Sequence, residues 1–293
     1  MDFIVSIIEQ GLIYGILSLG LYITYKILDF PDLTVDGSFP LGAAVTAALL
    51  TRDVNPFLTL PVAFLSGTLA GVCTGVIHVK GKVRDLLSGI IMMTALWTIN
   101  LYIAGTSNVP LFSKENIFKN GVMERIVPEA FRPYTTLFII LILTLICKIL
   151  LDVYLKTKSG YLLQAVGDND VLVTSLAKAQ GNVKILGLAI ANGLVTPAGC
   201  IFAQEERVFE ISMGTGAMVI GLASVIIGTS IFKKVTFVKT TTAVIVGSII
   251  YKACVAVALR NFEPQAMKLI TAVLFLIILV ISTGRKTKVR GNA

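Results

Sequence analysis

Charged and metal-binding residues are scarce in this chain. Only 14% of its 293 residues are charged, whereas a soluble domain usually carries about a quarter. It has one histidine, His78, and its four cysteines lie within apolar runs that lack the spacing of metal ligands. We therefore expect the cysteines to behave as small buried hydrophobic residues, and we expect neither a metal site nor a soluble globular domain.

Sequence signatures of an enzyme are missing as well. No segment matches the phosphate loop G-x-x-x-x-G-K-S/T, so the chain does not itself carry P-loop ATP hydrolysis. Its loops contain no plausible nucleophile–base pair. The formal net charge is +8, but the cationic residues gather in a few short clusters, which suits membrane topology better than nucleic-acid binding. We expect a protein that is not an enzyme and binds no nucleic acid.

Long apolar runs are what the chain does have. Hydrophobic residues make up 55% of it and the mean hydropathy is +0.86. Several runs reach the roughly 20 residues that span a bilayer as a helix. The pattern predicts an all-α polytopic membrane protein with one transmembrane domain over residues 1–293. Nine hydrophobic elements are expected, at 5–28, 38–50, 57–77, 86–104, 134–155, 185–203, 209–231, 240–258 and 265–283.

The basic clusters predict how the chain is oriented. Lysines and arginines favour the cytoplasmic ends of membrane helices. We expect the protein to lie in the cell membrane. Placing every basic cluster on the cytoplasmic side puts the N-terminus outside the cell and the C-terminus in the cytoplasm. The clusters fall at 80–84, 156–184, 233–239 and 285–290.

A polar break interrupts the first long apolar region. Between 11–28 and 39–50 stands the acidic, proline-bearing string DFPDLTVDGS. Carboxylates and irregular backbone at membrane depth are costly, and they survive where they line a cavity or pack inside protein. One interpretation is local: Asp36 or Ser38 caps a half-helix that begins at mid-membrane, and Asp29 lies at the inner headgroup boundary.

The other interpretation of this break is functional. Asp32 or Asp36 would line the translocation pathway, where it would recognise the amino group of a zwitterion or shape the gate. The candidate pathway residues in the break are Asp32, Thr34, Asp36 and Ser38.

A second break echoes the first. After the apolar segment 185–203 comes the acidic string QEERVFEISMGTG, followed by a Gly/Ala-rich helix. In the predicted topology the first copy runs inward and the second outward, as in an inverted repeat whose broken helices flank the transport path. We expect inverted halves of roughly 1–133 and 134–293.

Polar residues also mark the segment 86–104. Asn and Thr commonly hydrogen-bond across membrane helices, so Thr94 and Asn100 suit either helix packing or the lining of the pathway. Trp97 falls in mid-helix, which favours buried packing. The following loop, 105–133, either docks an external partner or is an ordinary solvated loop.

The longest basic connection, 156–184, carries two short amphipathic segments. The first, from Tyr161 to Val166, is expected to stop at Gly167, and the second to start at Asp168 or Asp170. Gly181 would end that second helix. Their apolar faces either pack against the chain's own helix ends or dock into a cytoplasmic partner.

Three blocks carry a family resemblance. They are GLIYGILSLGLYITYKILDFPDLTVDGSFPLGAA, SGYLLQAVGDNDVLVTSLAKAQGN, and GLAIANGLVTPAGCIFAQEE with GTGAMVIGLASVIIG. In this order they resemble the permease subunits of bacterial ABC importers for branched-chain amino acids, ribose and nucleosides. The strings DFPDLTVDGSF and SGIIMMTALWTINLYIAG look most like a narrower branch, encoded with a lipoprotein binding protein and an ATPase, for which tryptophan or tyrosine uptake has been proposed.

The resemblance implies a type II-like importer permease that forms a homodimer within the lipid membrane. Two cytoplasmic ABC ATPase subunits and an extracytoplasmic lipoprotein binding protein would be its partners. ATP and Mg²⁺ would bind the ATPase, and this chain would bind no cofactor. The implied function is import of a small organic solute, an amino acid and possibly an aromatic one. An ion-coupled secondary transporter is the alternative, because inverted repeats and intramembrane carboxylates suit that class too.

The resemblance also assigns the loop around 160–182 to coupling with the ATPase. Many relatives carry a basic residue where Gln164 stands, so a charge contact at that position does not carry over. The candidate coupling residues are Gly160, Val166, Gly167, Asp168, Asn169, Asp170, Leu172, Leu176 and Gly181.

Overall fold

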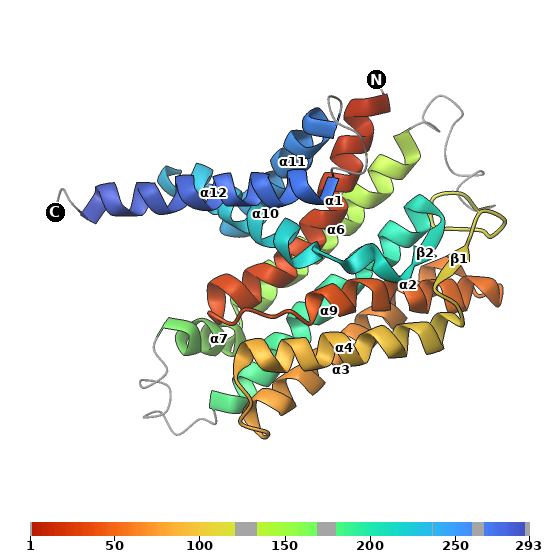
Figure 1. Ribbon diagram of the computed structural model, residues 1–293, viewed down its shortest axis with the longest axis horizontal. Coiled ribbons are helices and arrows are strands. Elements are labelled where there is room, and N and C mark those ends of the chain that lie inside the picture. The colour runs from red at the N-terminus through yellow and green to blue at the C-terminus, as the bar shows by residue number, and fades with distance from the viewer. Residues whose placement is uncertain (1, 121–133, 169–179, 236, 260–266, 291–293) are drawn as a thin grey trace.

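A computed structural model describes residues 2–120, 134–168, 180–235, 237–259 and 267–290. Within these ranges the chain is helical apart from a two-stranded sheet and short connections (Figure 1). Seven helices are long and apolar enough to cross a membrane, and two shorter apolar ones accompany them. The predicted all-α polytopic membrane fold is confirmed.

Within the described ranges, four helices precede the middle of the chain and four follow it. The first group is α1 (Asp2–Leu21), which continues as a π-helical segment (Tyr22–Ile27), then α2 (Val35–Thr51), α3 (Thr59–Val79) and α4 (Asp85–Ala104). The second group is α9 (Gln180–Glu206), α10 (Ala217–Ile231), α11 (Thr240–Leu259) and α12 (Met267–Arg290). Between them lie α6 (Thr135–Leu155) and α7 (Lys158–Asp168).

Every predicted hydrophobic element overlaps one of these helices, but two predicted helix ends are wrong. The helix α7 runs through Gly167 to Asp168 instead of stopping at Gly167. Gly181 does not end a small helix; it lies in the first described turn of α9. A Cβ at Gly181 would collide with the Val79 side chain of α3, so this glycine serves close helix packing rather than termination.

The two groups of helices pack in corresponding pairs. The helix α3 lies along α9 while α11 lies along α1, and α2 contacts α9 while α10 contacts α1. In each group the last helix covers the short one, since α4 packs on α2 and α12 packs on α10 (Figure 1). Each short helix is therefore held between helices of both groups.

Glycines let α9 approach its neighbours at backbone distance. On α3, Gly67, Gly71 and Gly75 face successive turns of α9, where an added Cβ would collide with Asn192, Leu188 and Ile185 respectively. Between α2 and α9 the contact is reciprocal, because Gly42 meets the Thr196 carbonyl and Gly199 meets the Phe39 carbonyl. These three glycines therefore form a packing surface on α3, since small residues let membrane helices approach closely.

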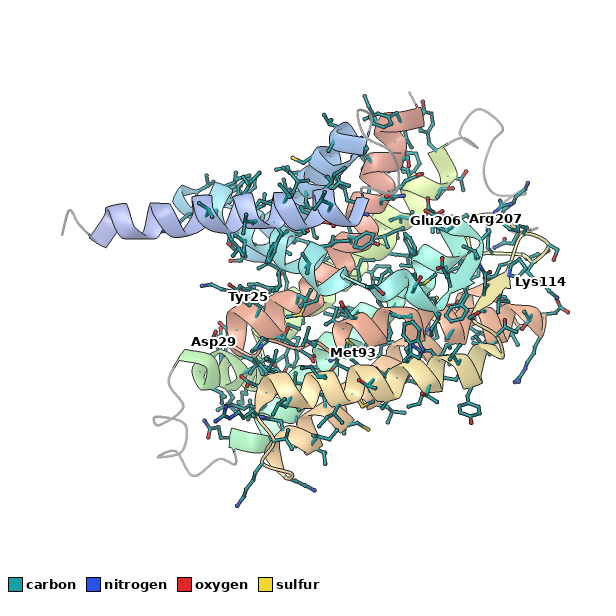
Figure 2. All side chains as sticks on the ribbon, in the orientation of Figure 1. Tyr25, Asp29, Met93, Lys114, Glu206 and Arg207 are labelled. Atoms are coloured by element: carbon teal, nitrogen blue, oxygen red, sulfur yellow. The ribbon has the colours of Figure 1, made fainter. Side chains whose placement is uncertain are left out.

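The molecule has two chemically distinct ends. At the end that we call the basic end, α7 meets the π-helical segment, and Phe30 lies edge-on to His78 at 5.1 Å between ring centroids. At the opposite end, which we call the β end, β1 (Asn108–Pro110) pairs antiparallel with β2 (Val208–Glu210). Figure 2 shows Asp29 at the first end and Lys114 with Arg207 at the other. The strand pair, which was not predicted, ties the segment after α4 to the segment after α9.

Candidate functional site: the junction of two half-helices

Both breaks lead into a half-helix, meaning here a short helix that starts directly after a break. The first break begins where the π-helical segment ends, with Asp29 in the left-handed region at φ +51°. The half-helix α2 then starts at Val35, and α10 starts at Ala217 after Gly216 at φ +86°. The N-termini of α2 and α10 lie against each other, so the junction of the two half-helices is the candidate site.

Asp32 is the centre of a buried polar network at this junction. Its side chain is fully buried, and its carboxylate accepts hydrogen bonds from the Thr34 backbone N–H at 2.9 Å and from the Asn192 amide at 2.8 Å. The Asn192 side-chain oxygen in turn accepts a bond from the Ser38 hydroxyl at 2.7 Å. Asp32 and Ser38 are thus fixed to the same residue of α9.

Thr34 extends the network to α3. Its hydroxyl lies 2.9 Å from the hydroxyl of Thr74, and both side chains are fully buried. Buried polar groups are nearly always hydrogen-bonded, and satisfied networks of this kind favour one arrangement of the helices. The network therefore joins the first break to α3 and α9.

Asp36 caps the other half-helix and not its own. Its carboxylate accepts bonds from the backbone N–H of Met218 at 2.7 Å and of Gly216 at 3.1 Å, at the first turn of α10. A carboxylate suits that position because the first N–H groups of a helix lack partners and the helix dipole is positive there. The predicted capping of α2 by Asp36 or Ser38 is wrong: Thr34 is the N-cap, without a side-chain bond.

The structure separates the two candidates on α4. Asn100 is fully buried against α2, and its amide donates to the Gly37 carbonyl at 3.1 Å while its side-chain oxygen has no partner. Thr94 lies on the exposed side of the helix, and its hydroxyl bonds to the Ile90 carbonyl. Trp97, expected to be buried, is 46% exposed. Asn100 joins the junction and Thr94 does not.

At the basic end, α7 uses its apolar face within the chain. Leu163 is fully buried and Val166 nearly so, while Gly160 and Gly167 sit against the backbone of Tyr154 and Ile27. This corresponds to the alternative that the first amphipathic segment packs against the chain's own helix ends. Asn169, Asp170, Leu172 and Leu176 lie outside the described residues, as does the second segment.

An ion-pair cluster that was not predicted holds α6 near α11 at the same end. Asp152 pairs with Lys148 at 3.1 Å and with Lys239 at 3.0 Å, and it accepts a bond from the Thr241 hydroxyl. The side chain of Asp152 is only 11% exposed, so this cluster is better shielded than an ordinary surface pair.

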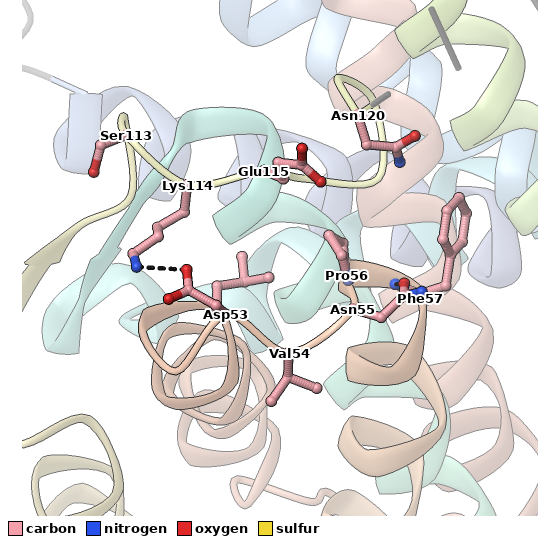
Figure 3. Close-up of a pocket in the computed structure, with 10 residues that line it drawn as sticks. Asp53, Val54, Asn55, Pro56, Phe57, Ser113, Lys114, Glu115 and Asn120 are labelled. Carbon is pink, nitrogen blue, oxygen red and sulfur yellow. Dashed lines mark hydrogen bonds and ion pairs between the residues drawn. The ribbon is translucent and has the colours of Figure 1, made fainter. Parts of the chain in front are cut away.

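A pocket of about 780 Å³ opens at the β end (Figure 3). It lies between the loop after α2 and the segment 113–120, and Lys114 closes one side through an ion pair with Asp53 at 2.7 Å. The other lining residues are Leu50, Val54, Asn55, Pro56, Phe57, Ser113, Glu115 and Asn120. Figure 3 shows Glu115 and Lys114 facing the pocket from the segment that follows β1. Across the described ranges, no group of acidic, cysteine or histidine side chains could hold a metal ion.

Sequence reasoning missed Asn192, which links Asp32 to Ser38. A signal was present, because this asparagine stands alone in the apolar run of α9 and a lone amide in such a helix needs a partner. Its partners are 160 and 154 positions away in the sequence, so the pattern along the chain does not identify them.

The chain is similar to a family of known membrane transport proteins. The family model described as branched-chain amino acid transport system / permease component matches residues 3–282. A tyrosine transport system permease protein of Clostridioides difficile is 46% identical over 97% of this chain and 92% of its own length. An uncharacterized protein of Rickettsia prowazekii is 31% identical over 95% of this chain and 97% of its own. A ribose import permease of Escherichia coli is 24% identical over 76% and 68%. No solved structure matches.

Proposed function

The chain belongs to the family of branched-chain amino acid transport system permease components, and from that premise we propose that it carries an aromatic amino acid into the cell. It is the permease of an ABC-type importer and not itself an enzyme. The single observation that carries the substrate proposal is the 46% identity, over nearly the full length, to a tyrosine transport system permease.

The basic end faces the cytoplasm in this proposal. The loops at that end hold Lys80, Lys82, Arg84, Lys156 and Lys158, which is the charge bias of cytoplasmic loops. The N-terminus then lies outside and the C-terminus inside, and the β end with its pocket faces outward. Corresponding helix pairs with opposite directions support inverted halves, with α1–α4 and α9–α12 as the repeated units.

An ABC-type permease works with an ATPase and a binding protein. We place two ATPase subunits at the basic end, on the loop 156–184, and a lipoprotein binding protein at the β end, on the loop 105–133. A second copy of this chain completes the membrane part. ATP and Mg²⁺ belong to the ATPase, and this chain holds no cofactor of its own.

The gate is the junction of the half-helices. Asp32, Thr34 and Ser38 hold the start of α2 on α9 and α3, and Asp36 holds the start of α10 on α2. All of these polar groups are engaged within the chain, so they support the shape of the gate rather than recognition of the substrate. Thr94 and Trp97, on the exposed side of α4, are the side chains that we place along the pathway.

Uptake in proteoliposomes tests the proposed function. The chain is reconstituted with its partner ATPase and binding protein, and uptake of radiolabelled L-tyrosine is followed with and without ATP inside. We expect ATP-dependent uptake that survives proton and sodium ionophores. Uptake that is abolished by the ionophores and does not depend on ATP would instead identify an ion-coupled secondary transporter.

The coupling loop has its own test. Leu172→Glu and Leu176→Glu should abolish both uptake and association with the ATPase while membrane insertion stays normal. Phe112→Glu is the matched control for ATPase association, because Phe112 is 68% exposed at the β end and faces the other side of the membrane. If the ATPase still co-purifies with both loop variants, the coupling assignment is wrong.

A further inference from the structure

A buried lysine lies where α1, α9 and α11 meet, near the β end. Lys252 is only 8% exposed, and its Nζ lies 3.7 Å from the centroid of the Tyr14 ring. Its ammonium donates a hydrogen bond to the Gln10 side-chain oxygen at 3.4 Å. Among the described residues this ammonium forms no ion pair. An ammonium has three donors, so this one is poorly satisfied for a buried charge.

Carboxylates gather around this lysine without pairing with it. Glu205 and Glu206, at the end of α9, interact electrostatically with Lys252, and Glu9 of α1 interacts with Glu205. One oxygen of Glu205 is buried and has no hydrogen-bond partner. Buried charges in native proteins are nearly always paired, and a group left without a partner calls for an explanation.

Gln10 bridges the opposite charges. Its amide oxygen faces the Lys252 ammonium, and its amide nitrogen donates to Glu206 at 3.4 Å. The amide thus presents an acceptor to the cation and a donor to the anion, as the head group of an amino acid would. Both contacts lie at the long end of the hydrogen-bond range, so a ligand that carries full charges would bind both partners more strongly.

Aromatic side chains stand beside this cluster. Tyr14 stacks on Phe39 at 5.7 Å between centroids and meets Phe202 edge-on at 5.8 Å. Glu206 is exposed and Phe202 is partly exposed, so the cluster is open on their side. An aromatic side chain placed against Tyr14 and Phe202 would gain the edge and stacking contacts that such rings favour.

We propose that Lys252, Glu205 and Glu206 form a binding site for the zwitterion of an aromatic amino acid. The carboxylate of the ligand takes the place of the Gln10 oxygen on Lys252, and its ammonium lies between Glu205 and Glu206. Gln10 is a placeholder, meaning that its side chain occupies the position of the ligand head group and moves away when the ligand binds. The inference rests on the proposed function and moves recognition of the amino group away from Asp32 and Asp36, whose oxygens are already bonded.

Direct binding tests the site in the permease–ATPase complex, held in nanodiscs without the binding protein. The probe is radiolabelled L-tyrosine, measured by scintillation proximity. Lys252→Met and Glu206→Gln should each weaken binding at least tenfold, while Lys252→Arg, which keeps the charge, should stay within threefold. L-phenylalanine should compete, whereas tyramine and 3-phenylpropanoate, each lacking one of the two charges, should not.

Gln10→Ala separates a ligand site from a purely structural charge bridge. If Gln10 is a placeholder, its removal leaves L-tyrosine binding intact or makes it tighter. If the cluster only holds three helices together, Gln10→Ala and Lys252→Met both lower the melting temperature and neither changes a binding constant. Lys119→Met, an exposed lysine at the same end, is the control and should bind as the wild type does.

Two outcomes overturn the site. One is the absence of saturable L-tyrosine binding by a wild-type complex whose full importer transports L-tyrosine, and the other is unchanged binding in both Lys252→Met and Glu206→Gln. Failure of the proposed function looks different, because then the wild-type importer with its binding protein does not take up L-tyrosine at all.

Discussion

The two breaks have similar shapes but opposite chemical roles. The first, residues 28–34, supplies side chains: Asp32 and Thr34 are fully buried and bond to α9 and α3. The second, residues 207–216, supplies backbone groups. Gly216, and Met218 just after the break, donate their N–H groups to the Asp36 carboxylate, and Gly214 packs on the carbonyl of Asp36. Its own acidic side chain Glu210 is exposed and bonds only locally, to Ser212.

The two breaks are thus similar in backbone shape and different in polar chemistry. One carboxylate, Asp36, serves the N-terminus of the opposite half-helix, so α10 depends on α2 for its cap. Substitutions in the first break and at Asp36, in the first turn of α2, should therefore disturb both half-helices. Polar substitutions in the second break should disturb neither, provided that the close backbone contact at Gly214 and the left-handed backbone of Gly216 are kept.

Loss of Asp32 should have the largest effect on stability. Asp32→Ala leaves the Asn192 amide and the Thr34 N–H without their buried acceptor, which costs about 3 kcal/mol. Denaturant titration of the purified chain in detergent measures this change in the free energy of unfolding. Asp29→Asn is the matched control, since Asp29 is exposed and asparagine tolerates its left-handed backbone. Equal stability of the two variants would show that the hydrogen-bond network around Asp32 does not stabilise the fold.

Loss of the Asp36 cap should have a smaller effect. Asp36→Ala should cost about 1 kcal/mol, the usual value of a helix N-cap, and Asp36→Asn less, because asparagine caps nearly as well. The same titration gives both values, with Glu210→Ala as the control from the second break. A larger loss in Glu210→Ala than in Asp36→Ala would reverse the proposed asymmetry.

The smallest effects are expected on α4. Asn100→Leu removes one hydrogen bond to Gly37, worth about 0.6 kcal/mol in a membrane helix, but it also removes an oxygen that has no partner. Thr94→Val should leave stability within about 0.5 kcal/mol of the wild type. If Thr94 lines the pathway, uptake falls in Thr94→Val without a change in stability. Normal uptake by Thr94→Val would limit the candidate functional site to the junction of the half-helices.

Patterns along the chain were enough to predict the helices and both breaks. Apolar length, the strings DFPDLTVDGS and QEERVFEISMGTG, and the spacing of Gly67, Gly71 and Gly75 are local signals, and each corresponds to a feature of the structure. The predictions failed where a residue serves a distant segment. Local capping rules assign Asp36 to its own helix, whereas its partners Gly216 and Met218 lie 180 and 182 positions away.

Other features depended on tertiary contacts in the same way. Gly181 suits a helix end by composition, but the close approach of Val79 gives it a packing role. The pairing of Asn108–Pro110 with Val208–Glu210 needs the two segments to be brought together first, and strands of three residues carry almost no signal in the sequence. The cluster around Lys252 joins three helices and was likewise outside the reach of pattern reasoning.

Uptake by the reconstituted importer tests directly whether Asp36 of α2 holds α10 at the proposed gate. Initial rates of ATP-driven L-tyrosine uptake and of ATP hydrolysis are compared for wild type, Asp36→Ala and Glu210→Ala at equal amounts of assembled complex. The account predicts at least tenfold slower uptake in Asp36→Ala with hydrolysis retained, and wild-type behaviour in Glu210→Ala. Uptake by Asp36→Ala at the wild-type rate would contradict it.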